Sequence, residues 1–588
     1  IGGGTSGSFT QNLGFHSCGG LTLAANGTFN LAGGTFNSGY TTLSSDDYIG
    51  DNGTATFNQT GGTHYVGQYS TSGRTLYVGA EGGTGTYILH GGSLNVTGDI
   101  VVGNHISGTT SKGTFTLSGG YAAVSGGLTV SDLGVVTMSA GGLTAAHIDN
   151  YGSFTHTGGI IGDAATLFTN FATFNAAGST GVFLGQFVNY GSFTADDSYV
   201  IGNGFTNYTS LVIYSGHSFT VNGSALDNEQ QLSLYGGTLN LGAGLLNNAS
   251  ASLSGSLTGN GALVNNGLLS LGGALTLNNS GLSTNNGNFT VGSGLTLRLN
   301  NSAFTNNASF SLAGGIIAGT KAFTNGTTGT LSGSGFISTP FANLGTLYLE
   351  SGALNIANAF TNAGTLQLAG NTATLFGGAI TNTGTLEGFG SVGSDLANAG
   401  EIAPVAGTLI VNGALTNTGL LSAQAGAKLL ARNFPANSGV ISLTGGTFDT
   451  AGHTLTNNGQ ISGYGSLNTG GLTNAGSISI TGATSTITGD LTNNAGHKVE
   501  VLYNPAIFTG HVTNNGLFKS TKTTITFTGL YTENGTFFSD PSTQIFSDVS
   551  IGTTSAWIGS TGDKFVVTGN FSSHSTANTI WNTDAAEL

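Results

Sequence analysis

Short stretches of alternating apolar and polar residues run along the whole chain, separated by turns rich in glycine and asparagine. In residues 346–349 (Thr-Leu-Tyr-Leu) and 353–356 (Ala-Leu-Asn-Ile), every second side chain is strongly apolar. A period of two residues predicts short β-strands with one buried face. No stretch shows the 3.6-residue period of an amphipathic helix, so we predict an all-β protein.

The strand pattern returns at a nearly constant interval. The motif apolar-x-Asn-x-Gly can be followed from Asn150 to Asn534, in 20 intervals that average about 19 residues. Three short strands and three turns in each repeat predict one coil of a parallel β-helix (β-solenoid). Coils stacked about 4.8 Å apart would make a rod of roughly 100 Å. Representative positions of the predicted structural asparagine ladder are Asn150, Asn189, Asn265, Asn362, Asn417 and Asn474.

Each repeated position should form a column through the stack. We expect the recurrent asparagine at a turn, because asparagine tolerates left-handed backbone angles and its amide can bond to its equivalent in the next coil. The glycine two residues later should permit the turn. A core aromatic column is predicted at Phe304, Phe323, Phe341 and Phe360.

The first part of the chain follows a longer rhythm. Its Gly-Gly pairs recur at positions 33–34, 61–62, 91–92 and 119–120, which is a wider spacing than that of the later asparagines. They predict a thicker N-terminal part with 28–30-residue repeats and protruding loops at 68–74 and 104–112. We therefore expect three regions. These are a long-repeat solenoid (1–149), a regular β-helix of Asn-x-Gly coils (150–540) and an irregular or terminal-coil segment (541–588) that could join subunits.

Composition excludes several other classes of protein. Only 6% of the residues are charged while 38% are hydrophobic, which is unlike a disordered chain, and 5 prolines exclude collagen. Cys18 is the one cysteine, so no intrachain disulfide can form, and we expect it to be a small buried residue. The net charge of −15 argues against nucleic-acid binding, and no stretch is apolar enough for membrane insertion.

Two groups of residues resemble known bacterial surface proteins. The segments 75–87 and 89–96 resemble the repeats of autotransporter-associated and exosortase-sorted extracellular proteins. The later Asn-x-Gly coils resemble filamentous-haemagglutinin-like adhesins. The resemblance implies a secreted protein of the Gram-negative cell surface or matrix, and hence an extracellular location.

Candidate chemical groups are sparse. Acidic residues near turns could be solvated or could form a weak Ca²⁺ site, although Ca²⁺ needs about six oxygen ligands. These weak candidates are Asp46, Asp47, Asp51, Asp196 and Asp197. The histidines of the thick part are expected to be isolated turn or surface residues, with a metal site as the alternative. They are His64, His90 and His105. We predict no cofactor.

Enzymes built on β-helices need clustered carboxylates or a carboxylate-bound cation with a base, and no such row is visible. We therefore predict no catalytic residues and no enzymatic activity. Five tyrosines gather early in the chain and could form either a binding surface or part of the core. They are Tyr40, Tyr48, Tyr65, Tyr69 and Tyr77.

Three functions remain open at this stage. The favoured one is a subunit of an extracellular filament or matrix fibre, because no cap for the open strand edges is evident and the coils could join head to tail into a homopolymer. The second is a monomeric surface adhesin that binds carbohydrate or a host protein through residues 40 to 112. The third is a polysaccharide-degrading enzyme.

Overall fold

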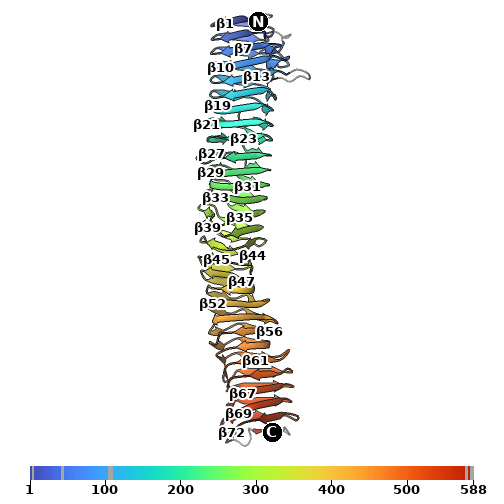
Figure 1. Cartoon of the computed structure of the whole chain (residues 1–588), viewed down its shortest axis with the longest axis vertical. Coiled ribbons are helices and arrows are strands. Elements are labelled where there is room, and N and C mark those ends of the chain that lie inside the picture. The colour runs from blue at the N-terminus through green and yellow to red at the C-terminus, as the bar shows by residue number, and fades with distance from the viewer. Residues whose placement is uncertain (3–5, 41–44, 104–109, 577–580, 583–588) are drawn as a thin grey trace. The chain divides into compact units, whose positions relative to one another are not determined.

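The protein is an all-β parallel β-solenoid with coils of about 20 residues, which confirms the predicted fold class. The computed structural model describes residues 1–2, 6–40, 45–103, 110–576 and 581–582. This part of the chain contains strands and turns and no helix (Figure 1). A single isolated bridge among the described residues, between Gly292 and Gly314, is antiparallel.

The chain forms two compact units. The N-terminal unit comprises Ile1–Val291 and Leu295–Phe304, and the C-terminal unit comprises Gly292–Gly294 and Thr305–Leu588. Within each unit the strands of successive coils lie one above another (Figure 1).

A typical coil of the N-terminal unit contains three strands, and each strand pairs in parallel with its equivalent in the next coil. In one such pair of strands Tyr87 lies opposite Phe115. The strands of this coil are β10 (Thr84–Leu89), β11 (Ser93–Val96) and β12 (Ile100–Val102), followed by β13 (Lys112–Leu117), β14 (Tyr121–Val124) and β15 (Gly127–Val130).

The C-terminal unit repeats this plan with shorter corners. Its coils include β43 (Phe341–Asn343), β44 (Thr346–Leu349), β45 (Ala353–Ile356) and β46 (Phe360–Asn362). The following strand, β47 (Thr365–Gly377), is long enough to pair with both β44 and β45. In the coil of β47, one continuous strand thus takes the place of two separate strands.

Alternation of side chains places the apolar residues inside the coils. In β44, Leu347 and Leu349 are buried while Thr346 and Tyr348 are partly exposed. Full burial of one such side chain stabilises the fold by about 1.5–3 kcal/mol. The strand period that predicted the fold therefore also supplies its core.

The long repeats are confined to three steps of the N-terminal unit. Gly27 pairs with Ala55, Ala55 with Gly85 and Gly85 with Gly113, so these three steps have the wide spacing predicted from the Gly-Gly pairs. The steps on either side, from Gly7 to Gly27 and from Gly113 to Gly134, are as short as those of the later coils. The extra length lies in the connections between strands, such as the one between β8 (Thr63–Val66) and β9 (Leu76–Ala80).

The reason predicted for the asparagines and glycines of the Asn-x-Gly motif is wrong in part. No ladder asparagine has a positive φ, and each ends a strand in extended conformation instead. Gly364, two residues after Asn362, has no positive φ either. A Cβ atom there would lie 2.1 Å from the Gly345 carbonyl oxygen of the preceding coil. Close approach of neighbouring coils, rather than turn geometry, requires this glycine.

Candidate functional site

The recurrent asparagines form buried ladders inside both units. In the N-terminal unit, Nδ2 of each asparagine donates to Oδ1 of its equivalent in the next coil at 2.6–3.0 Å. The members of this ladder are Asn150, Asn170, Asn189, Asn207, Asn228, Asn247, Asn265 and Asn285.

The same ladder occurs in the C-terminal unit, with Nδ2 to Oδ1 distances of 2.6–2.9 Å. Its members are Asn306, Asn325, Asn343, Asn362, Asn382, Asn398, Asn417, Asn437, Asn457, Asn474, Asn493 and Asn514.

Most ladder amides also donate to backbone carbonyls at the coil corner, and Asn362 is an example. Nδ2 of Asn362 donates to Oδ1 of Asn382 (2.7 Å) and to the carbonyl oxygens of Gly364 (3.3 Å) and Thr385 (3.1 Å). Its Oδ1 accepts from Asn343 at 2.6 Å. One side chain thus ties three coils together, and its buried polar atoms are satisfied, as buried polar groups require. The ladder is a structural device.

The last place of the C-terminal ladder is taken by Glu533, at the end of β67 (Thr524–Glu533), and not by Asn534. Asn514 Nδ2 donates to both Glu533 carboxylate oxygens at 2.9 Å, and Tyr531 and the Gly535 amide donate at 2.7 and 2.8 Å. Asn534 is exposed and donates to Asn515. The sequence-based ladder was therefore shifted by one residue in this coil.

Burial gives Glu533 an unusual protonation behaviour. Desolvation raises the pKa of its carboxyl from 4.5 to about 7, against the opposing effect of the hydrogen bonds from Asn514, Tyr531 and Gly535. The folded state therefore binds a proton more tightly than the unfolded chain. The contribution of the Glu533 carboxyl to the stability of the folded state is fully present below pH 4.5 and is lost as the pH rises through about 7. The free energy of unfolding changes by about 3 kcal/mol over this range.

The predicted aromatic column is buried throughout. Ring centroids are 6.0 Å apart between Phe323 and Phe341, and 5.3 Å apart between Phe341 and Phe360. Phe304 belongs to the N-terminal unit, where its ring lies 5.6 Å from that of Phe289. The column continues from Phe360 through Ile380, Leu396 and Leu415.

The acidic candidates do not gather into one site. Asp46 is half-buried and accepts the Thr75 amide at 3.0 Å, and Asp197 lies 3.5 Å from His217. Asp51 ends β6 (Asp47–Asp51) and Asp196 follows Ala195 on the surface. Asp47 departs from the expectation of a solvated turn, because it is fully buried and accepts the Leu21 amide at 2.9 Å.

His64 is buried beside Asp47, which contradicts its predicted place on a turn or the surface. Gln59 Nε2 donates to two backbone carbonyls, so its Oε1 accepts from the Tyr87 hydroxyl at 2.7 Å. Nδ1 of His64, 3.0 Å from that hydroxyl, must then donate to it, which leaves Nε2 to face Asp47 Oδ2 at 3.2 Å. Ser38 Oγ also lies 3.3 Å from Nε2 and donates to Asp47 Oδ2 at 2.5 Å, so these side chains form one buried hydrogen-bonded cluster.

The other histidines occupy different environments. His90 bonds to the Ser118 hydroxyl at 2.7 Å on the surface, and His105 lies outside the described residues. His156, which sequence analysis did not single out, is buried with Nδ1 2.7 Å from the Tyr199 hydroxyl. Burial lowers the pKa of His156 to about 4, so this ring is neutral at physiological pH.

The five early tyrosines lie on the surface or are half-buried, and none belongs to the core. Tyr40 and Tyr69 are exposed and meet edge to face at 5.0 Å. Tyr48 and Tyr77 stack in parallel at 5.1 Å. Both pairs come from successive coils, so this edge of the thick part presents an aromatic surface.

Cys18 is a free thiol that is half-buried, at the end of β2 (Phe15–Cys18). Burial, followed by the charge of Asp47, raises its pKa. A raised pKa lowers the thiolate fraction, so the structure does not activate this cysteine as a nucleophile.

A second aromatic surface was missed from the sequence. The residue directly after four consecutive ladder asparagines is aromatic and exposed: Tyr151, Phe171, Tyr190 and Tyr208. Neighbouring rings stack in parallel, with centroids 4.6, 5.4 and 4.7 Å apart. The dipeptides Asn150-Tyr151 and Asn189-Tyr190 were visible in the repeat, but only the in-register stacking reveals that they form a continuous ridge.

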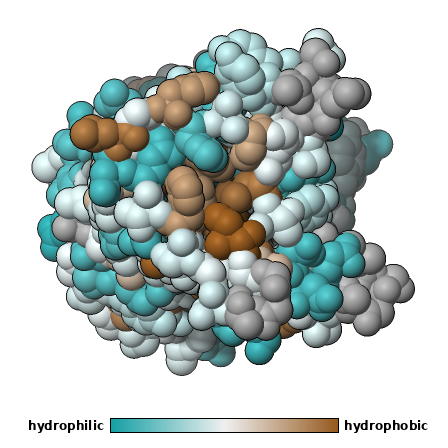
Figure 2. Space-filling model, turned by 90° about the horizontal axis from the view of Figure 1, so that it is seen from above, coloured by the Kyte–Doolittle hydropathy of each residue, from teal (hydrophilic) through white to brown (hydrophobic). Residues whose placement is uncertain are grey.

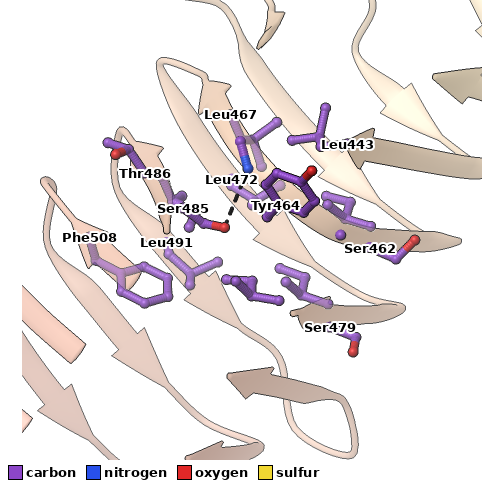
Figure 3. A pocket seen from close by; sticks show the side chains of 16 residues that line it. Leu443, Ser462, Tyr464, Leu467, Leu472, Ser479, Ser485, Thr486, Leu491 and Phe508 are labelled. Atoms are coloured by element: carbon purple, nitrogen blue, oxygen red, sulfur yellow. Dashed lines mark hydrogen bonds between the residues drawn. The ribbon is translucent and has the colours of Figure 1, made fainter. Parts of the chain in front are cut away.

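The C-terminal unit encloses a small cavity between coils (Figure 3). Its volume is about 20 Å³, which is room for one water molecule. Apolar side chains such as Leu467, Leu472 and Leu491 line it together with Tyr464, and the Gly465 amide donates to the Ser485 hydroxyl at 3.4 Å. The lining contains no carboxylate or histidine, so this cavity offers no acid or base.

No family model, curated protein or solved structure matches the chain. The described residues contain no group of three or more histidine, cysteine, aspartate or glutamate side chains placed to hold a metal ion. In the same part of the chain, no helix is long and apolar enough to cross a membrane.

Proposed function

We propose that the protein is a structural subunit of an extracellular bacterial filament or matrix fibre, in which copies join head to tail through open coil edges. The observation that carries this proposal is the in-register parallel stacking, in which each coil offers to the next the same strand edges that it pairs with. β1 (Gly7–Gln11) and β2 pair with β4 (Gly27–Leu31) and β5 (Thr35–Ser38), and no strand of the described residues pairs with their other side. Such an edge can accept a further parallel strand.

The core of this coil is open at the same edge. The partly exposed ring of Phe9 lies tilted against Phe29 at 4.9 Å, and the exposed ring of His16 stacks on Phe36 at 5.8 Å. Figure 2 looks onto this end and shows hydrophobic residues in its middle, surrounded by polar ones. A second copy that continued the stack would bury these rings and would pair with the other side of β1 and β2.

The third strand of the coil is already covered. Ile1 lies along β3 (Thr22–Ala24), with its amino group donating to the Thr22 carbonyl and its own carbonyl accepting the Ala24 amide, both at 3.1 Å. The proposed joint therefore uses β1 and β2. Its partners in the neighbouring copy are the last strands of the same two columns. These are β73 (Trp581–Asn582) in the column of β1 and β71 (Lys564–Val567) in the column of β2.

An extracellular location is part of the same proposal. It is supported by the low content of charge and cysteine and by the resemblance of residues 75–96 and of the Asn-x-Gly coils to surface proteins of Gram-negative bacteria. The proposed role requires no catalysis. The isolated placement of the acidic candidates and the apolar lining of the enclosed cavity support a protein that is not an enzyme.

Sedimentation velocity of the 588-residue chain over a range of concentrations tests the joint. Wild-type protein should form species that lengthen with concentration. Replacing Phe9 by lysine should leave monomers, because Phe9 pairs with the buried Phe29 on the inward face of the coil and the joint would bury the charge. Leu268→Lys, at a residue 57% exposed on the side of the coils, is the matched control and should assemble normally. A wild-type chain that stays monomeric at every concentration would contradict the proposal.

The exposed pair Tyr40 and Tyr69 favours a second candidate, a surface adhesin that binds carbohydrate or a host protein through residues 40–112. Tyr40 and Tyr69 offer an aromatic contact surface at low entropic cost. Glycan binding by wild-type protein that is lost in the Tyr40→Ala/Tyr69→Ala variant, without a change in assembly, would favour this candidate over the filament.

A further inference from the structure

One outer column of the N-terminal unit begins with exposed aromatic rings and continues with amide and carboxylate side chains, which a purely structural role does not require. It consists of the residues that directly follow the ladder asparagines, and we call it the outer column. Its members are Tyr151, Phe171, Tyr190, Tyr208, Glu229, Asn248, Asn266 and Asn286. The four rings at its start are 40–47% exposed although they stack on one another. An exposed aromatic row of this length is typical of an interaction surface.

A groove of about 420 Å³ opens at the start of the outer column. Tyr151 forms one wall, Leu133 and Val135 contribute apolar surface, and Lys112, Asp132 and Ser153 contribute polar groups. Phe171 covers one face of the Tyr151 ring, at 4.6 Å and 4°. In the preceding coil Ser131 holds the same position, since Val130 pairs with Asn150, so the column supplies no ring for the other face.

Hydroxyl groups run beside the ring ridge at the same spacing. They are the first residues of β19 (Ser153–Ile161), β21 (Thr173–Phe183), β23 (Ser192–Ala195) and β26 (Ser210–Ile213), which stack in register. All four of these side chains lie on the outward face of their strands. Each aromatic ring of the column is thus accompanied by one hydroxyl, two residues further along the chain.

The column continues beyond the rings with planar polar groups. Asn286 donates to Asn266 at 3.1 Å and Asn266 donates to Asn248 at 2.9 Å. Asn248 in turn donates to Asp227 at 2.9 Å and to Glu229 at 2.7 Å. Amide and carboxylate groups in one line offer donors and acceptors for vicinal hydroxyls.

We propose that the outer column binds one extended chain of a neutral polysaccharide, with one sugar ring stacked on the open face of Tyr151 in the groove. A pyranose ring has apolar C–H faces and a rim of hydroxyls, which match the open face of Tyr151 and the flanking hydroxyl row. The single lysine and single aspartate of the groove balance each other, which favours an uncharged sugar. One sugar unit is about as long as one coil step, about 4.8 Å, so successive units can meet successive coils.

This proposal is independent of the filament joint, because the groove and the column lie on the side of the coils, far along the chain from β1 and β2. It also differs from the adhesin candidate, whose tyrosine pairs precede residue 112. A structural stack alone would stabilise neighbouring coils without binding any ligand, and the experiment separates these roles.

Affinity electrophoresis in native gels with hydroxyethyl cellulose, compared with gels lacking it, tests the site on the full chain. The polysaccharide should retard wild-type protein, and Tyr151→Ala should weaken binding by up to about ten-fold. Tyr151→Phe keeps the platform and should bind normally. Tyr235→Ala is the matched control, because Tyr235 is 51% exposed and stacks on Tyr214 in another column. Circular dichroism checks that every variant is folded.

Three results would overturn the proposal. The first is wild-type protein that the neutral polysaccharide does not retard. The second is equal loss of binding in Tyr151→Ala and Tyr235→Ala, and the third is stronger retardation by anionic polygalacturonate than by the neutral polymer. If Tyr151→Ala abolished a lateral dimer while no polysaccharide bound, the column would instead be an interface between copies.

Discussion

Replacing Asn362 by alanine tests the energetic role of the ladder in the C-terminal unit. The change removes the donor to Asn382 Oδ1 and the acceptor for Asn343 Nδ2, which are 2.7 and 2.6 Å away. Asn343 Nδ2 keeps the Gly345 and Thr365 carbonyls at 3.1 and 3.0 Å. Asn382 Oδ1 is left buried without its donor.

The expected cost follows from these contacts. One unsatisfied buried acceptor costs about 1–3 kcal/mol, and the small void adds to it, so local stability should fall by about 2–4 kcal/mol. Asn362→Asp keeps the volume but cannot donate when ionised and buries a charge, so it should cost more than alanine. Thr361→Ala, at an exposed neighbour on the same strand, should change stability little.

Hydrogen exchange measured by mass spectrometry is the suitable assay, because each coil of a solenoid contacts mainly its neighbours and opens locally. Peptides that cover β43, β46 and β48 (Ile380–Asn382) should exchange about 30-fold faster or more in Asn362→Ala. Peptides from the N-terminal unit should not change. Unaltered exchange around β46 in this variant would refute the reasoning that the ladder amide holds adjacent coils together.

Three further predictions concern other buried groups. Glu533→Gln should abolish the decline in the stability of its coil that wild-type protein shows between pH 4.5 and about 7, read from urea unfolding at a series of pH values; an undiminished decline would contradict the raised pKa. Phe323→Ala should lower the unfolding free energy by about 3–5 kcal/mol, and a shift in the urea midpoint no larger than that of a surface variant would argue against the aromatic column. Asp47→Ala should leave the buried Leu21 amide without its acceptor and cost about 1–3 kcal/mol, whereas an unchanged unfolding free energy would argue against a stabilising role of this contact.

The fold could be predicted because its cause is periodic. Alternation of apolar residues specifies the strands, and repetition about every 19 residues specifies the stack, so each coil of the kind around Asn362 repeats the same information. Local departures from the period were harder to locate. In the coil of Glu533, the neighbouring Asn534 was mistaken for the ladder residue. The motif places its glycine two residues after the ladder position, and Gly535 therefore indicates Glu533 as the inward residue.

The chemistry of the surfaces could not be predicted, because it depends on which coils lie next to each other. His64 looked like a turn residue until the stacking placed it between Asp47 and Tyr87. Tyr151 and Phe171 are a full coil apart in sequence, and only the in-register pairing of Asn150 with Asn170 brings their rings together. Sequence reasoning identified the columns of repeated asparagine, glycine and phenylalanine, and it missed the surface columns whose members differ from coil to coil.

Electron cryomicroscopy of the protein at high concentration tests the proposed filament most directly. We expect filaments in which β1 and β2 of one copy pair in parallel with the last coil of the next, so that a strand spacing of about 4.8 Å continues across each joint. Isolated particles, or filaments whose copies touch only side to side, would contradict a joint built from the open edge of the first coil.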